Sequence, residues 1–259
     1  MSELNSLKQK CLAESNSFVA GDIKNYMTNW REISYDRNLL KLVNGVNILE
    51  ENDKVLTDFV SSKKGYNFDK VEREKISEEL RKMEKTGIIT KTFREEGEVI
   101  SNIFTRIKGD GVSLRLILNL KKLNKELQTE KFKMAGIVSA LKLIKKGSYM
   151  ASIDLIKAYY SVPVAEEQTK FLKFLWEGTY YKFNCLPNGY CRAPYYFTKI
   201  TKPIAAYLHN LGHLNCFYLD DTLIVSDTKE DCINNVLDTA HIFQKLGFKI
   251  HPGKSVFFT

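Results

Sequence analysis

Three long stretches of the chain repeat apolar residues with the period of an α-helix. They cover residues 70–86, 194–211 and 229–246, and each is followed directly by a glycine. Because glycine readily adopts the left-handed conformation in which many helices end, these glycines predict the three C-termini. Asp69 and Glu72 have the spacing of a capping box at the start of the first stretch. The pattern therefore predicts three amphipathic helices.

Weaker or shorter patterns predict the remaining elements of the N-terminal half. Residues 23–33 and 37–42 are expected to be helical, and residues 136–146 to form a short helix that ends before a glycine. Residues 99–107 and 113–120 are rich in β-branched and apolar side chains, and the segment "KGDGV" joins them. We expect these last two segments to pair as a β-hairpin.

From residue 148 onward the predicted elements follow the order strand, helix, strand, strand, helix, strand. The first strand, 148–153, ends at Asp154, the central hairpin turns at Asp220 and Asp221, and "FKI" at 248–250 is the last strand. This is the split βαβ order of a ferredoxin-like antiparallel sheet, so the sequence predicts an α+β fold. In that topology Asp154 and Asp220 end on neighbouring strands and should lie side by side.

Asp154, Asp220 and Asp221 would then form a cluster of like charges. Such carboxylates raise one another's pKa unless a cation lies between them, although an acidic pair is also common in a solvated turn. Hard oxygen ligands suit Mg²⁺, and two such ions about 3.5–4 Å apart stabilise the attacking and leaving oxygens of an in-line phosphoryl transfer. Since adjacent strand residues point to opposite faces, we expect Asp154 and Asp220 to be the principal ligands and Asp221 a looser third.

Composition fits a folded protein of a reducing, intracellular compartment. The chain has 259 residues, of which 44% are hydrophobic, and no run approaches the length of a membrane span. Its N-terminus lacks a signal-peptide core, so no membrane partner is expected. The five cysteines are odd in number and show no C-x-x-C spacing, which indicates neither a disulfide framework nor a zinc site.

The positive charge of the chain is unevenly distributed. The formal net charge is +8, and residues 106–133 hold eight Lys/Arg against three acidic residues. A basic block inside a folded region is typical of a surface that binds a polyanion, because phosphate contacts supply most of the sequence-independent affinity for nucleic acids. A solvated basic face explains the block equally well.

Five motifs resemble those of retroelement reverse transcriptases. "SIDLIKAYYSVPV", "LPNGYCRAPYYFTKI", "FYLDD" and "LGFKIHPGKS" are similar to the four palm motifs, in the same order, and "RLILNLKKLNKEL" resembles the fingers motif upstream. "KFKMAGIVSALKLIKKGSYMASIDL" and "LPNG" are most similar to the DIRS-type (tyrosine-recombinase) retrotransposon branch, and "WREISYDRNLLKLVNGVNI" resembles the leader of that group. The resemblance implies the fingers and ferredoxin-like palm of a right-hand polymerase.

The resemblance also implies a domain order. Residues 1–60 would form an N-terminal helical leader, 61–147 the fingers and 148–259 the palm, with part of the fingers recurring around 160–190. The family's primer grip, thumb and RNase H are expected to be absent from these residues. The expected location is intracellular, either cytoplasmic in a retroelement particle or nuclear.

The implied activity is RNA-directed DNA polymerisation, in which a dNTP is added to a primer on an RNA or DNA template. Two Mg²⁺ ions, with Mn²⁺ as an alternative, would be held by the family's metal-binding and catalytic aspartates, which match Asp154, Asp220 and Asp221. Tyr159 takes the place of the aromatic residue that excludes a ribose 2′-hydroxyl.

Further matched positions would contact the incoming nucleotide. Lys108 and Arg115 match the fingers residues that bind the triphosphate, and a flexible cation with a bidentate fork suits that task. Asn188 matches an amide side chain against nucleotide and template, and Gly189 would let the backbone approach closely. Lys254 matches a lysine proposed to protonate the departing pyrophosphate, although a surface salt bridge explains it equally well.

Three departures from the family pattern keep alternatives open. Lys157 stands where a second acid is expected, Arg192 replaces a small residue and could crowd the nucleotide or template, and residues 105–107 are less apolar than usual. A catalytically inactive, nucleic-acid-binding remnant is therefore one alternative. A viral RNA-dependent RNA polymerase is another, but Tyr159 and the sequence "YLDD" argue against it.

Overall fold

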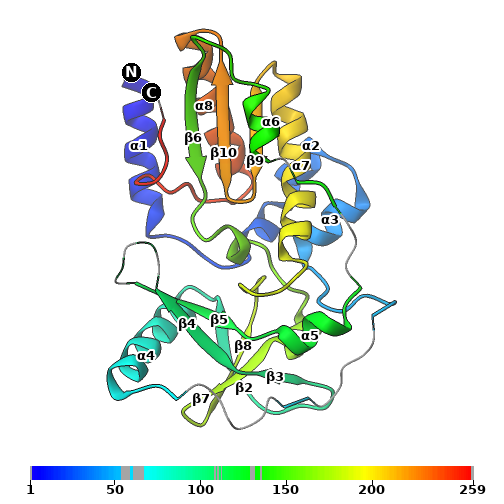
Figure 1. Cartoon of the computed structure of the whole chain (residues 1–259). Coiled ribbons are helices and arrows are strands. Elements are labelled where there is room, and N and C mark those ends of the chain that lie inside the picture. The colour runs from blue at the N-terminus through cyan, green and yellow to red at the C-terminus, as the bar shows by residue number, and fades with distance from the viewer. Residues whose placement is uncertain are drawn as a thin grey trace.

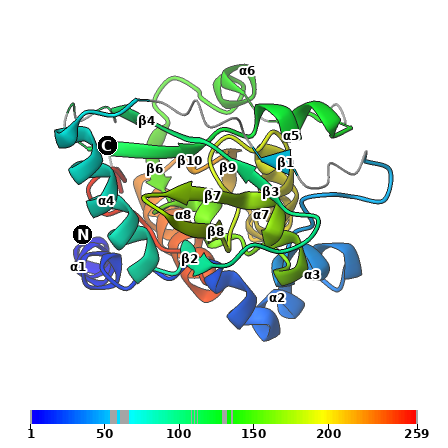
Figure 2. The same cartoon turned by 90° about the horizontal axis from the view of Figure 1, so that it is seen from below.

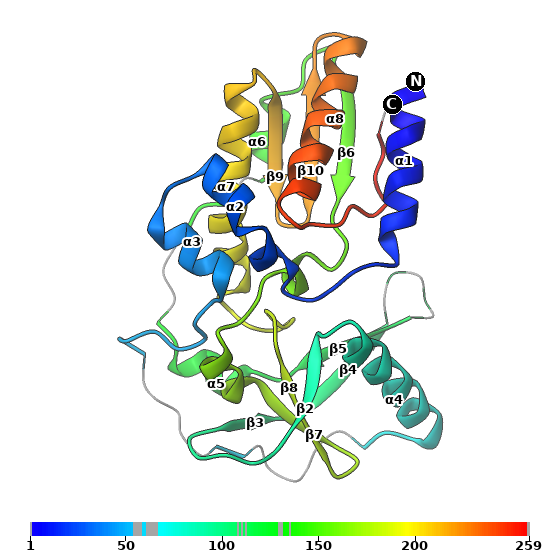
Figure 3. The same cartoon turned by 180° about the vertical axis from the view of Figure 1, so that it is seen from behind.

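Three of the described strands form an antiparallel sheet that has two long helices on one face. The strand order is β6–β10–β9, and α7 and α8 pack against the sheet. This three-stranded lobe forms the upper half of Figure 1, and Figure 3 shows α8 from the opposite side. Its elements are β6 (Tyr149–Asp154), α7 (Ala193–Asn210), β9 (Leu214–Tyr218), β10 (Asp221–Ser226) and α8 (Lys229–Lys245).

The element order of this lobe confirms the predicted α+β fold, except at its C-terminal end. The C-terminal segment runs along the outer edge of β6 and pairs there only through isolated bridges, such as Leu155 with Ile250. The prediction of a strand at 248–250 is therefore wrong. Pro252 lacks a backbone N–H and follows directly in a turn, so the segment cannot continue as a ladder.

Five further strands form a mixed sheet in the order β1–β3–β7–β8–β2. Strands β7 and β8 follow β6 in the chain, yet they pair with β3 and β2, so two separate parts of the chain build this five-stranded lobe. Figure 2 views the lobe from below. Its elements are β1 (Phe59–Val60), α4 (Lys70–Lys85), β2 (Ile89–Thr92), β3 (Val99–Ser101), η3 (Glu166–Leu172), β7 (Lys173–Trp176) and β8 (Thr179–Phe183).

A separate hairpin, β4 (Ile103–Ile107) with β5 (Leu114–Leu118), lies between the two lobes in Figure 1 and leads into α5 (Lys121–Glu126). The sequence predicted a single strand over residues 99–107, but the structure divides it at Asn102. The carbonyl of Asn102 accepts a hydrogen bond from the backbone N–H of Asn119 over 2.8 Å. The chain thereby leaves the five-stranded sheet after β3 and enters the hairpin.

The N-terminal residues 2–53, here called the leader, flank the three-stranded lobe on two sides (Figure 3). Trp30 is fully buried and donates from its indole N–H to the carbonyl of Leu246 over 3.2 Å. Its ring also packs edge-on against Phe248, with centroids 6.2 Å apart. The leader elements are α1 (Ser2–Ser15), η1 (Asp22–Tyr26), α2 (Met27–Ile33) and α3 (Arg37–Asn44).

Local capping signals predicted helix bounds better than weak periodicity did. The capping box of Asp69 and Glu72 is present at the start of α4. The helix predicted over 136–146 is much shorter, as α6 covers only Ile137–Leu141 and its apolar side chains are exposed. The remaining short helix is η2 (Ala158–Ser161).

The computed structural model describes residues 2–53, 59–60, 67–107, 109, 111, 113–128, 132–134 and 136–257. No helix within these ranges is long and apolar enough to cross a membrane. All five cysteines are free thiols.

Candidate active site

The end of β6 and the turn between β9 and β10 lie side by side in the sheet. Asp154 faces Asp221 across the β6–β10 pair, and Asp221 faces Tyr218 across the β10–β9 pair. The backbone N–H of Leu155 donates to the carbonyl of Asp220 over 3.1 Å. The structure therefore brings the three aspartates of the sequence prediction to one end of the sheet.

The backbone around the aspartates is strained. Leu219, in the turn between Tyr218 and Asp221, has a φ of 54°, and Lys157, just after β6, has a φ of 49°. Residues other than glycine rarely adopt this left-handed backbone conformation. In the described part of the chain these are two of three non-glycine residues with positive φ. Strain of this kind is typical of functional sites, where the surrounding structure enforces it.

Asp154 is buried, whereas Asp220 and Asp221 are exposed. Burial raises the pKa of Asp154, the Lys254 ammonium opposes that rise, and the two neighbouring carboxylates add to it. Lys254 Nζ lies 3.7 Å from Asp154 Oδ2, whereas the buried Asp154 Oδ1 has no hydrogen-bond partner among the residues described. Burial and the charge of Asp220 likewise raise the pKa of Asp221. The carboxylates are thus short of compensating positive charge.

The C-terminal segment holds the backbone of Asp154 on both sides. The Asp154 N–H donates to Ser255 Oγ over 3.1 Å, and the N–H of His251 donates to the Asp154 carbonyl over 2.8 Å. Sequence reasoning assigned a role to Lys254 in this segment but none to its neighbours. Their only signal was membership of the same motif, "LGFKIHPGKS".

The donor set of this site fits a hard divalent cation. Asp154 and Asp221 are paired at one end of the sheet with Asp220 in the adjoining turn, and one buried oxygen of Asp154 lacks the positive or donor group that burial requires. In their present arrangement, however, no three acidic, histidine or cysteine side chains of the described ranges could hold a metal ion together. Lys254, close to Asp154 Oδ2, supplies the nearest recorded positive charge instead. Asp154, Asp220 and Asp221 carry the carboxylate oxygens that such a cation prefers as ligands.

Tyr159 lies beside the acidic turn. Its ring packs edge-on against Phe197 in α7, with centroids 5.6 Å apart. Burial, with the charge of Asp220 and the neighbouring Tyr218, raises the pKa of Tyr159 to about 12. The phenol is therefore neutral at physiological pH, and its half-buried ring stands next to the aspartates as a steric element.

Asn188 contacts the partly buried phenol of Tyr160, which also lies within the electrostatic influence of Arg115. Asn188 donates from Nδ2 to the hydroxyl of Tyr160 over 2.8 Å. Burial raises the pKa of Tyr160, and the charges opposing that rise include the Arg115 guanidinium from β5. Sequence reasoning did not single out Tyr160, although it adjoins Tyr159. Lys108, which was predicted to act with Arg115, lies outside the described residues.

The backbone at Gly189 does make a close approach, and the group that it approaches belongs to β5. Its φ is +102°, and a Cβ built there would lie 2.8 Å from the carbonyl oxygen of Leu118 in β5. Asn124 of α5 donates from Nδ2 to the Gly189 carbonyl over 2.8 Å, and its Oδ1 accepts from the N–H of Cys191 over 3.1 Å. The loop that carries Asn188 is therefore fastened to β5 and α5.

Two of the three departures from the family pattern, Arg192 and Lys157, contact the leader. The guanidinium of Arg192 is buried and pairs with both carboxylate oxygens of Asp53, at 2.6 Å each. The side chain that was expected to crowd the nucleotide or template is thus held by the leader. The ammonium of Lys157 lies 5.1 Å from the ring centroid of Phe18, within cation–π range.

Several known proteins share parts of this sequence. The chain is 23% identical to the retrovirus-related Pol polyprotein from transposon 412 of Drosophila melanogaster over 151 residues, which cover 56% of this chain and 12% of that protein. It is 30% identical to the Gag-Pol polyprotein of walleye dermal sarcoma virus over 100 residues, covering 38% of this chain and 6% of that protein. The chain therefore spans only a small part of these relatives.

The fold is similar to that of solved polymerase structures. The foamy viral protease-reverse transcriptase in complex with dsDNA matches with a TM-score of 0.70 and 20% identity, covering 83% of this chain and 42% of that one. The same protein in complex with an RNA/DNA hybrid matches with a TM-score of 0.66 and 19% identity, covering 79% and 26%. The family model "Reverse transcriptase (RNA-dependent DNA polymerase)" matches residues 107–259, more than half of the sequence. On this match, together with the aspartates at the end of β6 and the β9–β10 turn, the chain belongs to the reverse transcriptase family.

Proposed function

We propose that the protein is an RNA-directed DNA polymerase that adds deoxynucleotides to a primer paired with an RNA or DNA template. The three-stranded lobe would be its palm, and the five-stranded lobe with the β4–β5 hairpin its fingers. The observation that carries the proposal is the strand register that sets Asp154 opposite Asp221, with Asp220 in the adjoining turn. Family membership and the basic block at 106–133 support it.

Each residue of the site has a separate task under this proposal. Asp154, Asp220 and Asp221 would hold Mg²⁺, which when bound stabilises charge on the attacking and leaving oxygens. The Tyr159 ring, backed by Phe197, would exclude a ribose 2′-hydroxyl. Asn188 would be oriented by its hydrogen bond to Tyr160. Because the Lys254 ammonium lies beside Asp154 and is mostly exposed, it could neutralise or protonate the departing pyrophosphate.

Triphosphate recognition would fall to the β4–β5 hairpin and the loop after β8. Arg115, together with the predicted Lys108, would bind the phosphates. Gly189 would allow the loop that carries Asn188 to lie close against β5. The guanidinium fork of Arg115 can make two charge-assisted hydrogen bonds to one phosphate group.

We further propose that the chain belongs to the DIRS-type branch. The leader motif "WREISYDRNLLKLVNGVNI" supports this, since its tryptophan and apolar residues are built into the core beside α8. The solved relatives whose titles name dsDNA and an RNA/DNA hybrid support a template–primer as the partner. Such an element would act inside the cell, in a cytoplasmic particle or in the nucleus.

The alternative of an inactive, nucleic-acid-binding remnant is weakened by one observation. Arg192 was one of the departures that suggested loss of function, yet its guanidinium is paired with Asp53 and bound to the carbonyl of Gln128. It is a built part of the structure and does not obstruct the aspartates.

The test is primer extension by protein expressed from the full open reading frame, with an RNA template and a DNA primer. We expect extension with dNTPs, and its loss in Asp154→Asn. Asp227→Asn is the matched control, because Asp227 is exposed and lies 3.9 Å from Lys145, away from the site. No extension by the unaltered protein, or equal extension by Asp154→Asn, would overturn the proposal.

A further inference from the structure

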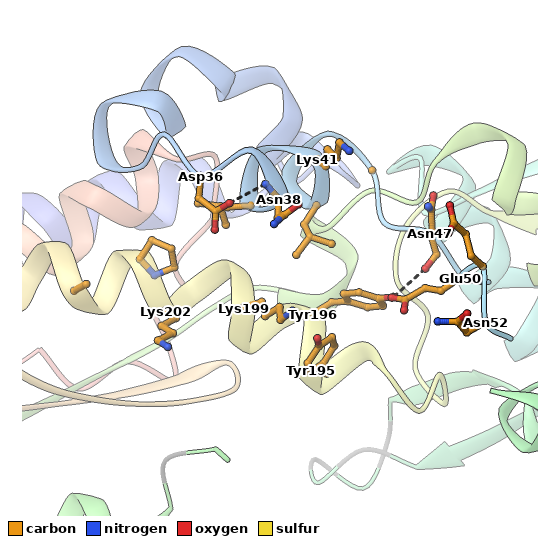
Figure 4. Close-up of a pocket in the computed structure, with 16 residues that line it drawn as sticks. Asp36, Asn38, Lys41, Asn47, Glu50, Asn52, Tyr195, Tyr196, Lys199 and Lys202 are labelled. Atoms are coloured by element: carbon orange, nitrogen blue, oxygen red, sulfur yellow. Dashed lines mark hydrogen bonds between the residues drawn. The ribbon is translucent and has the colours of Figure 1, made fainter. Parts of the chain in front are cut away.

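The leader segment between α3 and residue 53 is bound along its length by the rest of the chain. The hydroxyl of Tyr190 donates to the carbonyl of Ile48 over 2.7 Å, and the hydroxyl of Tyr196 donates to Glu50. Figure 4 shows Tyr196 reaching from α7 to the leader residues Asn47 and Glu50. Both tyrosines belong to the segment that follows Asn188, so the leader contacts the loop region directly.

Asp53 is the point at which three parts of the chain meet. Its carboxylate accepts both hydrogen bonds of Arg192 and one each from the backbone N–H groups of Glu50 (2.8 Å) and Gln128 (2.9 Å). The Arg192 Nε also donates to the carbonyl of Gln128 over 3.1 Å. The exposed fractions of Asp53 and Arg192 are 7% and 6%, so water competes little for these bonds. Asp53 therefore joins the leader to the chain just after α5 and to the residue that precedes α7.

A buried ion pair of this kind is weak evidence for stability alone. Removing two charges from water costs about as much free energy as their attraction returns, and apolar replacements are often as stable. Bidentate geometry, in contrast, fixes the orientation of both partners. The pair lies at one end of the loop 187–192, and the Asn124 bonds to Gly189 and Cys191 hold its middle.

We propose that Asp53, Arg192 and Asn124 are positioning residues that fix the loop 187–192, and with it Asn188, for selection of the incoming nucleotide. This inference rests on the proposed polymerase function. None of the three side chains is placed on the nucleotide; each acts through the loop. The leader would thereby contribute to the nucleotide site without reaching it.

The experiment separates loop position from stability. The double variant Asp53→Asn/Arg192→Gln removes both charges and leaves a neutral amide at each position. Asn124→Ala removes the second fastening without leaving a buried charge. Arg73→Gln, at an exposed pair with Glu177, is the matched control. Thermal unfolding, dNTP KM and kcat, and primer–template affinity are measured for each, together with hydrogen exchange of the loop amides.

We expect both test variants to raise the dNTP KM about ten-fold or more, since a ~1 Å misplacement of a positioning group costs on the order of 100-fold. Primer–template affinity should be unchanged, and the loop amides should exchange faster. An unchanged KM in folded, active variants would overturn the inference while leaving the polymerase intact. If the unaltered protein did not extend primers, the proposed function would fail. In that case hydrogen exchange still tests the positioning role on its own. Loop amides that exchange at the same rate in the test variants and in the unaltered protein would overturn it.

Discussion

At the scale of single residues, position 189 is restricted by two independent constraints. Its φ of +102° lies in a region that residues with a Cβ rarely adopt, and the Cβ itself would lie 2.8 Å from the Leu118 carbonyl oxygen. The first constraint concerns the backbone of the loop, and the second its distance from β5. The loop that carries Asn188 can thus be held against β5 in this way only if residue 189 is glycine.

The two constraints can be separated by comparing Gly189→Ala with Gly178→Ala. Gly178 also has a positive φ, +80°, but a Cβ there meets nothing within 4 Å. We expect Gly178→Ala to lower the free energy of unfolding by about 1–2 kcal/mol from backbone strain. Gly189→Ala should lower it by roughly 1–3 kcal/mol more, because of the steric overlap. Urea unfolding measures both, and equal losses would show that β5 yields to the added methyl group.

Replacement of Tyr159 by valine should open space beneath the sugar and admit ribonucleotides. The ring stands beside Asp220 and is supported by Phe197, so its loss removes bulk without removing charge. The measurement is the ratio of kcat/KM for dNTP and the matching rNTP. Tyr181→Val, in the five-stranded sheet, serves as the control. An active Tyr159→Val enzyme with undiminished preference for dNTP would assign sugar selection to another residue.

At the scale of elements, the β4–β5 hairpin sets two arginines directly opposite each other. Arg106 and Arg115 are cross-strand partners, so their side chains share a face of the hairpin. Like charges opposite one another destabilise a strand pair by a few tenths of a kcal/mol or more. An anion bound at this face would remove that repulsion. The sequence drew attention to Arg106 only as part of the less apolar segment 105–107. The strand pairing places it directly opposite Arg115.

Arg115→Ala should therefore impair nucleotide use more than template binding. Hydrogen bonds to charged groups contribute about 1.5–3 kcal/mol, which corresponds to roughly ten- to a few-hundred-fold in affinity. Arg106→Ala is the matched comparison on the same face and should have a smaller effect, since Arg115 and not Arg106 is among the charges that act on the Tyr160 phenol. Nucleotide and primer–template affinities are measured separately. A loss confined to template binding in Arg115→Ala would place this arginine in the general basic surface.

Elements with local signals were predictable, and elements that depend on distant partners were not. The capping box of α4 and the Thr228 cap of α8 lie within a few residues of the helices they begin. Strands β7 and β8 are strands because they pair with β3 and β2, which lie far away in the sequence. The aspartates could be placed because the order of elements determines which strands are neighbours. The contact of Asp53 with Arg192 could not be predicted, since no local sequence signal connects the two residues.

At the scale of the whole molecule, the Asp53–Arg192 pair makes the leader part of the fold. Burial alone would raise the pKa of Asp53, but the hydrogen bonds from Arg192 and from two backbone N–H groups lower it below its ordinary value. A carboxyl group with a lowered pKa in the folded state stabilises the protein above its unfolded pKa of about 3.9. That contribution is lost as the pH falls through the folded-state value.

The stability difference between the unaltered protein and Asp53→Asn should therefore depend on pH. At pH 7 the variant leaves Arg192 buried without its anionic partner, which costs about 3–5 kcal/mol. Below about pH 4 the difference should shrink, because Asp53 itself becomes protonated. Urea unfolding at several pH values measures it. Glu78→Gln, at an exposed helical pair with Lys82, should show little difference throughout. A pH-independent difference for Asp53→Asn would mean that the carboxylate charge is not what stabilises the contact.

The hydrogen bond from Trp30 to Leu246 has a consequence for how the chain is made. The two residues are 216 positions apart, so the indole has no partner until residue 246 has left the ribosome. At about 5–20 residues per second, that interval is roughly 10–40 s. During synthesis Trp30 therefore stays without the partner that buries it, and apolar surface exposed in this way favours aggregation. A fragment lacking α8 should then aggregate through its first helices.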